Sequence, residues 1–250
     1  MSPQSTHTDN SKHGRWVKVT HWVGTISFVL LLFSGFEILM VHPRLYWGNV
    51  GNDLTPALFE LPISRNYHHG GWEQSHAFFN NAGSPVSASR TYDIFNQNGW
   101  GRSLHFLSAW ILVMIGLIYL LTAIFSGHVR RNLLPGAGEL TFRKFFQDIR
   151  DHLRMKVSFV KGPQYGLLQK FSYVIVIFFL LPVIVLTGLT MSPAVTASHP
   201  IMLTIFLGAQ SARTIHFFAA FLLVLFLIVH LLMIIKSGFK QHMRAMTFGK

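Results

Sequence analysis

The chain has 250 residues, of which 50% are apolar and only 12% are charged, whereas about a quarter are charged in an average soluble domain. This composition excludes a disordered protein and argues against an ordinary soluble globule. The sequence contains no cysteine. Disulfides, iron–sulfur ligation by this chain, thioether-attached haem and thiol catalysis are therefore excluded.

Four long apolar segments predict four transmembrane helices, at about 16–41, 102–127, 167–191 and 210–236. Each has about 20 residues or more, which is enough to cross a hydrocarbon core of ~30 Å, and only the helical form satisfies the backbone of such segments in lipid. The first segment lacks a small-residue cleavage site and is too long for a signal peptide, so we expect it to be retained. The predicted fold is all-α: one integral membrane domain, 1–250, formed by a four-helix bundle with a long outer loop, 42–101, and a cytoplasmic loop, 128–166.

Basic residues are concentrated in the loops expected on one side of the membrane. The chain has 21 Lys and Arg against 9 Asp and Glu, and nine of the basic residues lie in 128–170. The positive-inside rule then places both termini and this loop in the cytoplasm. Topology and lipid headgroups account for the charge, and no nucleic-acid partner is needed. Within the basic loop, five apolar side chains at helical spacing predict an interfacial amphipathic helix: Phe142, Phe145, Phe146, Ile149 and Leu153.

Four of the 14 histidines fall within or at the ends of the predicted helices: His21, His105, His216 and His230. Ionisable groups inside a bilayer are costly and point to function. The helix directions place His105 and His216 at outer depth, and His21 and His230 at inner depth. The 14-residue step from His216 to His230 puts both on nearly one helix face, about 21 Å apart along the axis. This layout predicts two haems, each held by two histidines.

Haem also needs space between helices and partners for its propionates. We expect Gly35, Gly116 and Gly188 to provide the space, because glycine lets a backbone pass close to a flat ligand. Arg213, one turn before His216, is the candidate propionate partner on the outer side, and Arg15 or Lys18 is the candidate on the inner side.

Other interpretations of the histidines are possible. Membrane histidines can be hydrogen-bonding groups between helices, or members of a proton relay. The only membrane carboxylate, Glu37, is rotated by about 160° from His21, so it fits a relay poorly. No cysteine or aspartate completes a metal site around the loop histidines, His68, His69 and His76. Four further histidines are interpreted as polar surface: His128, His152, His199 and His242.

The histidine pattern resembles that of a family of bacterial di-haem cytochrome b membrane subunits, those of Ni–Fe hydrogenases, formate dehydrogenases and thiosulfate reductases. The resemblance covers most of the chain. It is carried by the opening Arg15, Lys18, His21 and Trp22, by His105, and by the two histidines 14 residues apart in the last helix. The stretch 166–193 is most similar to the thiosulfate-reductase branch, whereas the outer loop is longer than in the hydrogenase and formate branches.

The resemblance implies an electron-transfer subunit with two haem b groups and no catalytic residues of its own. It implies a molybdopterin oxidoreductase or a hydrogenase-type subunit as partner on the outer face, and a quinone as exchangeable substrate near the inner haem. Polar residues on the cytoplasmic side are candidates for the quinone site: His128, Gln164, Tyr165, Gln169 and Lys170. A stand-alone transmembrane haem reductase, a proton-coupled transporter and a structural anchor remain as alternatives.

Overall fold

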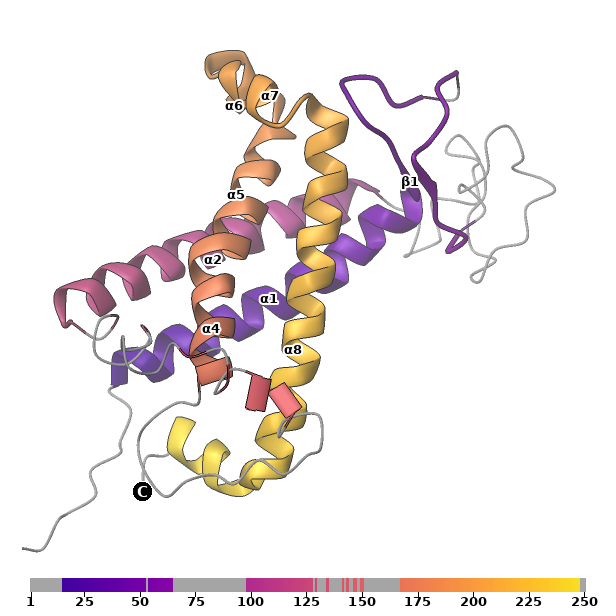
Figure 1. Ribbon diagram of the computed structural model, residues 1–250. Helices are drawn as coiled ribbons and strands as arrows, with labels where there is room; N and C mark the ends of the chain where they lie inside the picture. The colour runs from indigo at the N-terminus through magenta and orange to yellow at the C-terminus, as the bar shows by residue number, and fades with distance from the viewer. Residues whose placement is uncertain are drawn as a thin grey trace, which may run out of the picture. The chain divides into compact units, whose positions relative to one another are not determined.

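The computed structural model describes residues 15–52, 54–64, 98–127 and 167–247, together with residues 129, 134, 141, 143, 146, 147, 149 and 150. Within this part of the chain, four helices are long and apolar enough to cross a membrane (Figure 1). They span Arg15–Val41, Gly99–Phe125, Leu167–Thr190 and Ala209–Lys236. The predicted all-α membrane bundle is therefore confirmed. Residues 65–97 of the outer loop lie outside the described residues, and so does most of the predicted interfacial helix.

The first two membrane helices are continuous, whereas the third has a change of pitch. α1 is Arg15–Val41 and α2 is Asn98–Phe125. The third consists of α4 (Leu167–Ile175), one π-helical turn, η5 (Val176–Leu180), and α5 (Leu181–Thr190).

A proline in the first turn of α5 explains this change. Pro182 has no N–H, and its ring would clash with a carbonyl of the preceding turn of a regular α-helix. The N–H of Leu181 instead bonds to the carbonyl of Val176, as in a π-helix. The wider turn allows the helix to continue through the proline.

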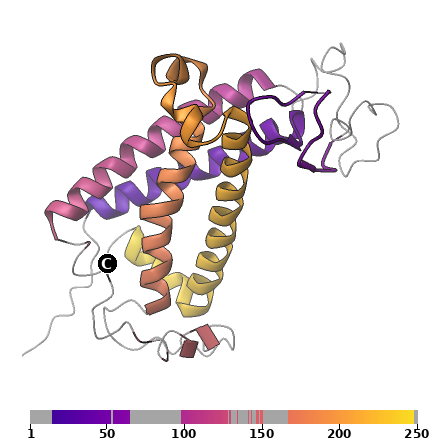
Figure 2. The same cartoon turned by 45° about the horizontal axis from the view of Figure 1, so that its top comes forward.

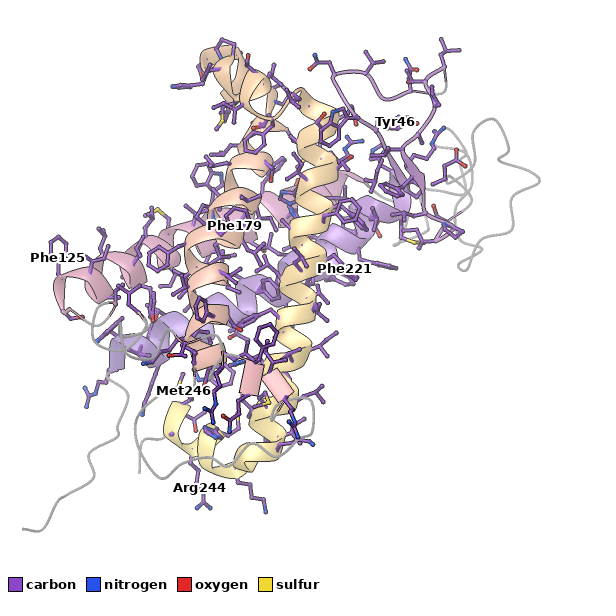
Figure 3. All side chains as sticks on the ribbon, in the orientation of Figure 1. Tyr46, Phe125, Phe179, Phe221, Arg244 and Met246 are labelled. Atoms are coloured by element: carbon purple, nitrogen blue, oxygen red, sulfur yellow. The ribbon has the colours of Figure 1, made fainter. Side chains whose placement is uncertain are left out.

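The fourth membrane helix extends beyond its apolar part. α8 covers Ala209–Met246, but Gly238 within it has φ 111° and ψ 77°, a backbone conformation that glycine adopts far more readily than other residues. The chain changes direction there, and the short helix that follows ends at Met246 (Figures 1 and 3). The Trp22 Nε1–H donates a hydrogen bond of 2.9 Å to the carbonyl of Met246, which ties this end of the chain to α1.

The chain forms two compact units, each containing part of every membrane helix. The first consists of Met1–Trp22, Ile118–Val174 and Phe226–Lys250, and the second of Val23–Leu117 and Ile175–Leu225. In the first unit, aromatic contacts join the helices: the ring centroids of Trp16 and Tyr119 are 5.6 Å apart, and those of Tyr173 and Phe226 are 6.3 Å apart.

In the second unit, α1 and α2 approach closely at one buried glycine. A Cβ at Gly101 would lie 2.8 Å from Cγ of Glu37 and 3.9 Å from the carbonyl oxygen of Ser34. Phe33 and Trp100 pack nearby, with ring centroids 5.7 Å apart. A larger residue at position 101 would therefore displace the Glu37 side chain.

Residues 42–52 and 54–64 (segment 42–64), which follow α1, form a small irregular structure at the start of α8 (Figures 1 and 2). β1 (Arg44–Leu45) pairs antiparallel with β2 (Phe59–Glu60). Between the strands, the Gly48 carbonyl accepts from the N–H groups of Gln210 and Ser211, at 2.9 and 3.2 Å. The first turn of a helix has N–H groups without helical partners, and segment 42–64 supplies partners for two of them in α8.

Two more contacts fix segment 42–64 to α8. The Thr214 hydroxyl donates to the carbonyl of Tyr46 at 2.6 Å, and the Gly48 N–H donates to the Ser211 hydroxyl at 2.7 Å. The backbone before α8 fits closely, because a Cβ at Gly208 would clash with the Gly48 carbonyl oxygen. Two short helices, α6 (Pro193–Ser198) and α7 (Ile201–Ile205), connect α5 to this point (Figure 1).

Large apolar side chains project outward along the membrane helices. Phe125, Phe179 and Phe221 are examples, with exposed fractions of 86%, 63% and 58% (Figure 3). Several of the most buried side chains are small and polar, among them Ser34 and Thr187, both 0% exposed. Apolar outside and polar inside is the arrangement expected when lipid rather than water surrounds the helices.

Candidate haem-binding site

His105 of α2 and His216 of α8 face each other within the second unit. Their ring centroids are 6.2 Å apart and their planes make an angle of 58°. A bond from imidazole nitrogen to a transition metal is about 2 Å long, and Nε2 lies about 1 Å from its ring centre. Two imidazoles on opposite sides of one metal ion therefore have centroids roughly 6 Å apart. The two histidines predicted to form the outer pair have this spacing.

The Nδ1 atoms of both rings are held by hydroxyl groups from two other helices. Nδ1 of His105 lies 3.0 Å from Oγ of Ser34 in α1, and Nδ1 of His216 lies 3.0 Å from Oγ1 of Thr187 in α5. Each hydroxyl donates its own proton to the carbonyl one turn back in its helix, at 2.7 Å. The hydroxyl oxygens therefore accept from Nδ1–H, which leaves the Nε2 lone pair of each ring for a metal.

A backbone carbonyl and a glycine also lie close to each histidine ring. The backbone carbonyls of Leu31 and Ile184 also interact with His105 and His216, respectively. A Cβ built at Gly35 would lie 3.4 Å from Cε1 of His105, and one built at Gly188 would lie 3.5 Å from Cε1 of His216.

We call these two equivalent groups the histidine cradles: Leu31, Ser34 and Gly35 in α1, and Ile184, Thr187 and Gly188 in α5. In each, a carbonyl and a hydroxyl hold one edge of the imidazole, and the ring lies close to the glycine backbone. The structure thus places Gly35 and Gly188 against the histidine rings. Ser34 and Thr187 were not predicted as site residues, although Ser-Gly and Thr-Gly pairs at matching depths were visible in the sequence.

The donor set fits a haem and fits a bare metal ion poorly. No group of three or more His, Cys, Asp or Glu side chains able to hold a metal is present among the described residues. Two imidazoles alone leave most positions of a metal ion unfilled, whereas a porphyrin brings four nitrogen ligands of its own. Ligation of haem iron by two histidines fills both axial positions and favours electron transfer over oxygen binding.

Arginines precede both histidines by one turn. Arg102 precedes His105 in α2, and Arg213 precedes His216 in α8. The two guanidinium groups are close enough to interact electrostatically, and Arg213 also interacts with Tyr46. Arg213 was predicted as a propionate partner. Arg102 was missed, although the Arg-x-x-His spacing occurs before both ligands.

The second histidine pair belongs to the first unit. His21 of α1 and His230 of α8 interact electrostatically. The His230 ring stacks on Phe226, with centroids 5.8 Å apart and an angle of 18°, and the His21 ring packs edge-on against Trp22. The two histidines that the helix directions assign to one depth thus lie within electrostatic range of each other.

The other predicted site residues have varied surroundings. Arg15 begins α1 and is exposed. A Cβ at Gly116 would meet no atom within 4 Å. Lys170 is buried, at 7% exposure, and the neighbouring Gln169 side chain donates to the hydroxyl of Tyr173 at 2.8 Å.

The remaining polar residues considered in the sequence are exposed, buried, or outside the described residues. His199 and His242 are exposed, as predicted for surface histidines. Glu37 is buried next to Gly101 in the second unit. Seven residues lie outside the described part of the chain: His68, His69, His76, His128, His152, Gln164 and Tyr165.

Comparison with known proteins identifies the family. A family model described as prokaryotic cytochrome b561 matches residues 12–249. The chain belongs to this family. It is also 29% identical over 222 residues, 89% of each chain, to a protein of Azospira oryzae named putative protein-methionine-sulfoxide reductase subunit YedZ1. No solved structure matches the chain.

The family resemblance predicted from the histidine pattern is thereby confirmed. The protein is a multi-pass membrane protein of the prokaryotic cytochrome b561 family. It is a membrane electron-transfer subunit that binds b-type haem.

Proposed function

We propose that this cytochrome carries two b-type haems in the bacterial inner membrane and transfers electrons between the quinone pool and an oxidoreductase bound at its outer face. The observation that carries this proposal is the outer histidine pair: ring centroids 6.2 Å apart with both Nδ1 atoms hydrogen-bonded to hydroxyls. Neither feature is needed for simple helix packing. When bound, the haems supply the one-electron chemistry.

At the outer site, the protein contributes ligands, orientation and charge. His105 and His216 would ligate the iron through Nε2. The guanidinium groups of Arg102 and Arg213 would bind the propionates, since both lie one turn before a ligand and interact with each other. No ion pair between either arginine and a carboxylate is present in the part of the chain that the structure describes. Two cations held near each other would be stabilised by the carboxylates of a bound porphyrin.

At the inner site, His21 and His230 would be the axial ligands, with Arg15 as the candidate propionate partner. Gly116 remains a predicted contact of the porphyrin. We propose that a quinone exchanges electrons and protons at this site. Gln169 and Lys170 are the quinone-site candidates among the described residues, and each could hydrogen-bond a quinone oxygen.

The partner is proposed from similarity. The Azospira oryzae relative is named as a putative subunit of a protein-methionine-sulfoxide reductase. The resemblance to thiosulfate-reductase subunits points to a molybdopterin oxidoreductase, with a hydrogenase-type subunit as the alternative. Segment 42–64 and helices α6 and α7 would lie on the outer face if both termini are cytoplasmic, as the loop charges predict.

A haem count tests the proposal. The protein is purified in mild detergent, a reduced-minus-oxidised spectrum is recorded, and haem is quantified as its pyridine complex. The proposal predicts a b-type spectrum and two haems per chain. One haem per chain would mean that one histidine pair has another role, and well-folded protein without haem would refute the redox function.

A further inference from the structure

We infer that Ser34 and Thr187 are positioning residues of the outer haem, which fix the orientation of the two axial histidines and lower the haem's midpoint potential. The inference rests on the proposed function, because it requires that His105 and His216 ligate haem. Its basis is the hydrogen bond from each Nδ1 to a fully buried hydroxyl on a different helix.

The contact between hydroxyl and histidine sets these two residues apart from other helical Ser and Thr. A hydroxyl inside a helix commonly bonds to the carbonyl one turn back in the same helix. Ser27 of α1 does this at 2.9 Å, and Thr190 of α5 at 2.8 Å, and both side chains are buried. Neither has a hydrogen bond to a histidine among the described residues. Ser34 and Thr187 make the same backbone bond and, in addition, each receives an imidazole from a neighbouring helix.

The direction of each hydrogen bond determines its electronic effect. A hydroxyl that already donates to a carbonyl is a better acceptor, because hydrogen bonds in a chain polarise one another. By accepting from Nδ1–H, it increases the electron density at Nε2 and makes the imidazole a stronger metal ligand. A stronger donor favours the oxidised state of the iron over the reduced state. Removing either hydroxyl should therefore raise the potential of the outer haem.

The same contacts orient the rings. In each cradle, the hydroxyl binds Nδ1, and the backbone of the adjacent glycine lies near Cε1 on the same edge of the imidazole. The two cradles are on different helices, and the ring planes make an angle of 58°. The EPR signal of a low-spin ferric haem depends on this angle, so a ring released from its hydroxyl should change the g-values.

The experiment uses the full-length protein with haem bound, in which each haem is followed by redox titration and EPR. Ser34→Ala and Thr187→Val remove the hydroxyls. Each is expected to increase the equilibrium constant for reduction of the outer haem about threefold, the size expected when one neutral hydrogen bond is lost. The two hydroxyls lie on different helices and share no partner, so the free energies should add. In the double variant the equilibrium constant should therefore rise about tenfold, a shift of about 59 mV for one electron.

Matched controls separate positioning from general packing. Ser27→Ala and Thr190→Val remove equally buried hydroxyls in the same helices and should leave the outer potential and g-values unchanged. Ser34→Thr and Thr187→Ser retain a hydroxyl and should restore values near those of the wild type. Loss of the outer haem from Ser34→Ala, with retention in Ser27→Ala and recovery in Ser34→Thr, would equally support the inference.

Two results would overturn the inference while leaving the proposed function intact. One is a wild-type haem count of two with unchanged outer potential and g-values in both hydroxyl variants. The other is an equal change in Ser34→Ala and Ser27→Ala. Absence of haem from the wild-type protein would instead refute the proposed function itself.

Discussion

The contact between α1 and the His105 ring leaves room for a methyl group but not for a larger side chain. A Cβ at Gly35 would lie 3.4 Å from Cε1 and 3.7 Å from Nδ1 of His105, which is close to ordinary van der Waals distance, so we expect Gly35→Ala to retain the outer haem. A leucine adds atoms about 1.5 Å beyond Cβ, which can reach well inside contact distance. Overpacking of this kind costs about 1–3 kcal/mol, equivalent to about 5- to 150-fold weaker retention of the outer haem.

The assay is the loss of outer-haem absorbance during dilution or titration with a haem-binding competitor, with the inner haem as an internal standard. Gly188→Leu should behave like Gly35→Leu, since a Cβ there would lie 3.5 Å from Cε1 of His216. Gly24→Leu is the matched control in α1, because a Cβ at Gly24 would meet only the end of the Leu112 side chain, at 3.9 Å. Normal retention of the outer haem in both Gly35→Leu and Gly188→Leu would refute the assignment of these glycines.

Three further changes test the packing that supports the sites. Trp22→Phe removes the hydrogen bond to Met246, so we expect the attachment of the end of α8 to α1 to be weaker by about 0.5–1.5 kcal/mol. Proteolysis at the end of α8 should then be faster, and an unchanged cleavage rate would contradict this. Thr214→Val removes the buried 2.6 Å hydrogen bond to the Tyr46 carbonyl. We expect this to weaken the attachment of segment 42–64 to α8 by about 1–3 kcal/mol and to speed proteolytic cleavage within that segment, whereas Thr214→Ser, which keeps the hydroxyl, should leave the cleavage rate unchanged. Gly208→Ala places a Cβ against backbone at φ 114°, and we expect a lower thermal midpoint, whereas an unchanged midpoint would show that this backbone can relax.

The sequence was sufficient to predict the membrane helices. Their apolar lengths gave four spans at about 16–41, 102–127, 167–191 and 210–236, and the structure has spans at Arg15–Val41, Gly99–Phe125, Leu167–Thr190 and Ala209–Lys236. Helix direction alone then assigned the histidines to two depths. The structure places the His105 ring beside the His216 ring, and His21 within electrostatic range of His230, because residues at the same depth on neighbouring helices can meet across a bundle.

The side-chain contacts of the site could not be predicted in this way. Treating helices as cylinders gives depth and face, but whether a hydroxyl reaches a histidine depends on the distance and rotation between two helices. Ser34 and Thr187 were therefore missed, since a helical hydroxyl usually bonds only within its own helix. Gly35 and Gly188 were expected to make room for a porphyrin, which stays a prediction; that each would also lie beside a histidine ring was not expected.

Two irregularities in the helix backbones follow from single residues in the sequence. Pro182 lies inside the third span, and such a proline requires a kink or a wider turn, which η5 provides. Gly238 follows the apolar part of α8 by two residues and breaks the helix there. The attachment of Gly48 to the first turn of α8 had no signal, because hydrogen bonds from a loop to a distant helix end leave no periodic pattern in sequence.

The central claim is that His105 and His216 ligate one and the same haem. It is tested most directly by the haem content of His105→Ala, His216→Ala and the double variant, each purified in detergent and compared with the wild type by pyridine haemochrome and redox titration. We predict that all three variants retain one haem per chain, with the same midpoint potential. A double variant that retains no haem, or single variants that lose haems of different potential, would contradict the account.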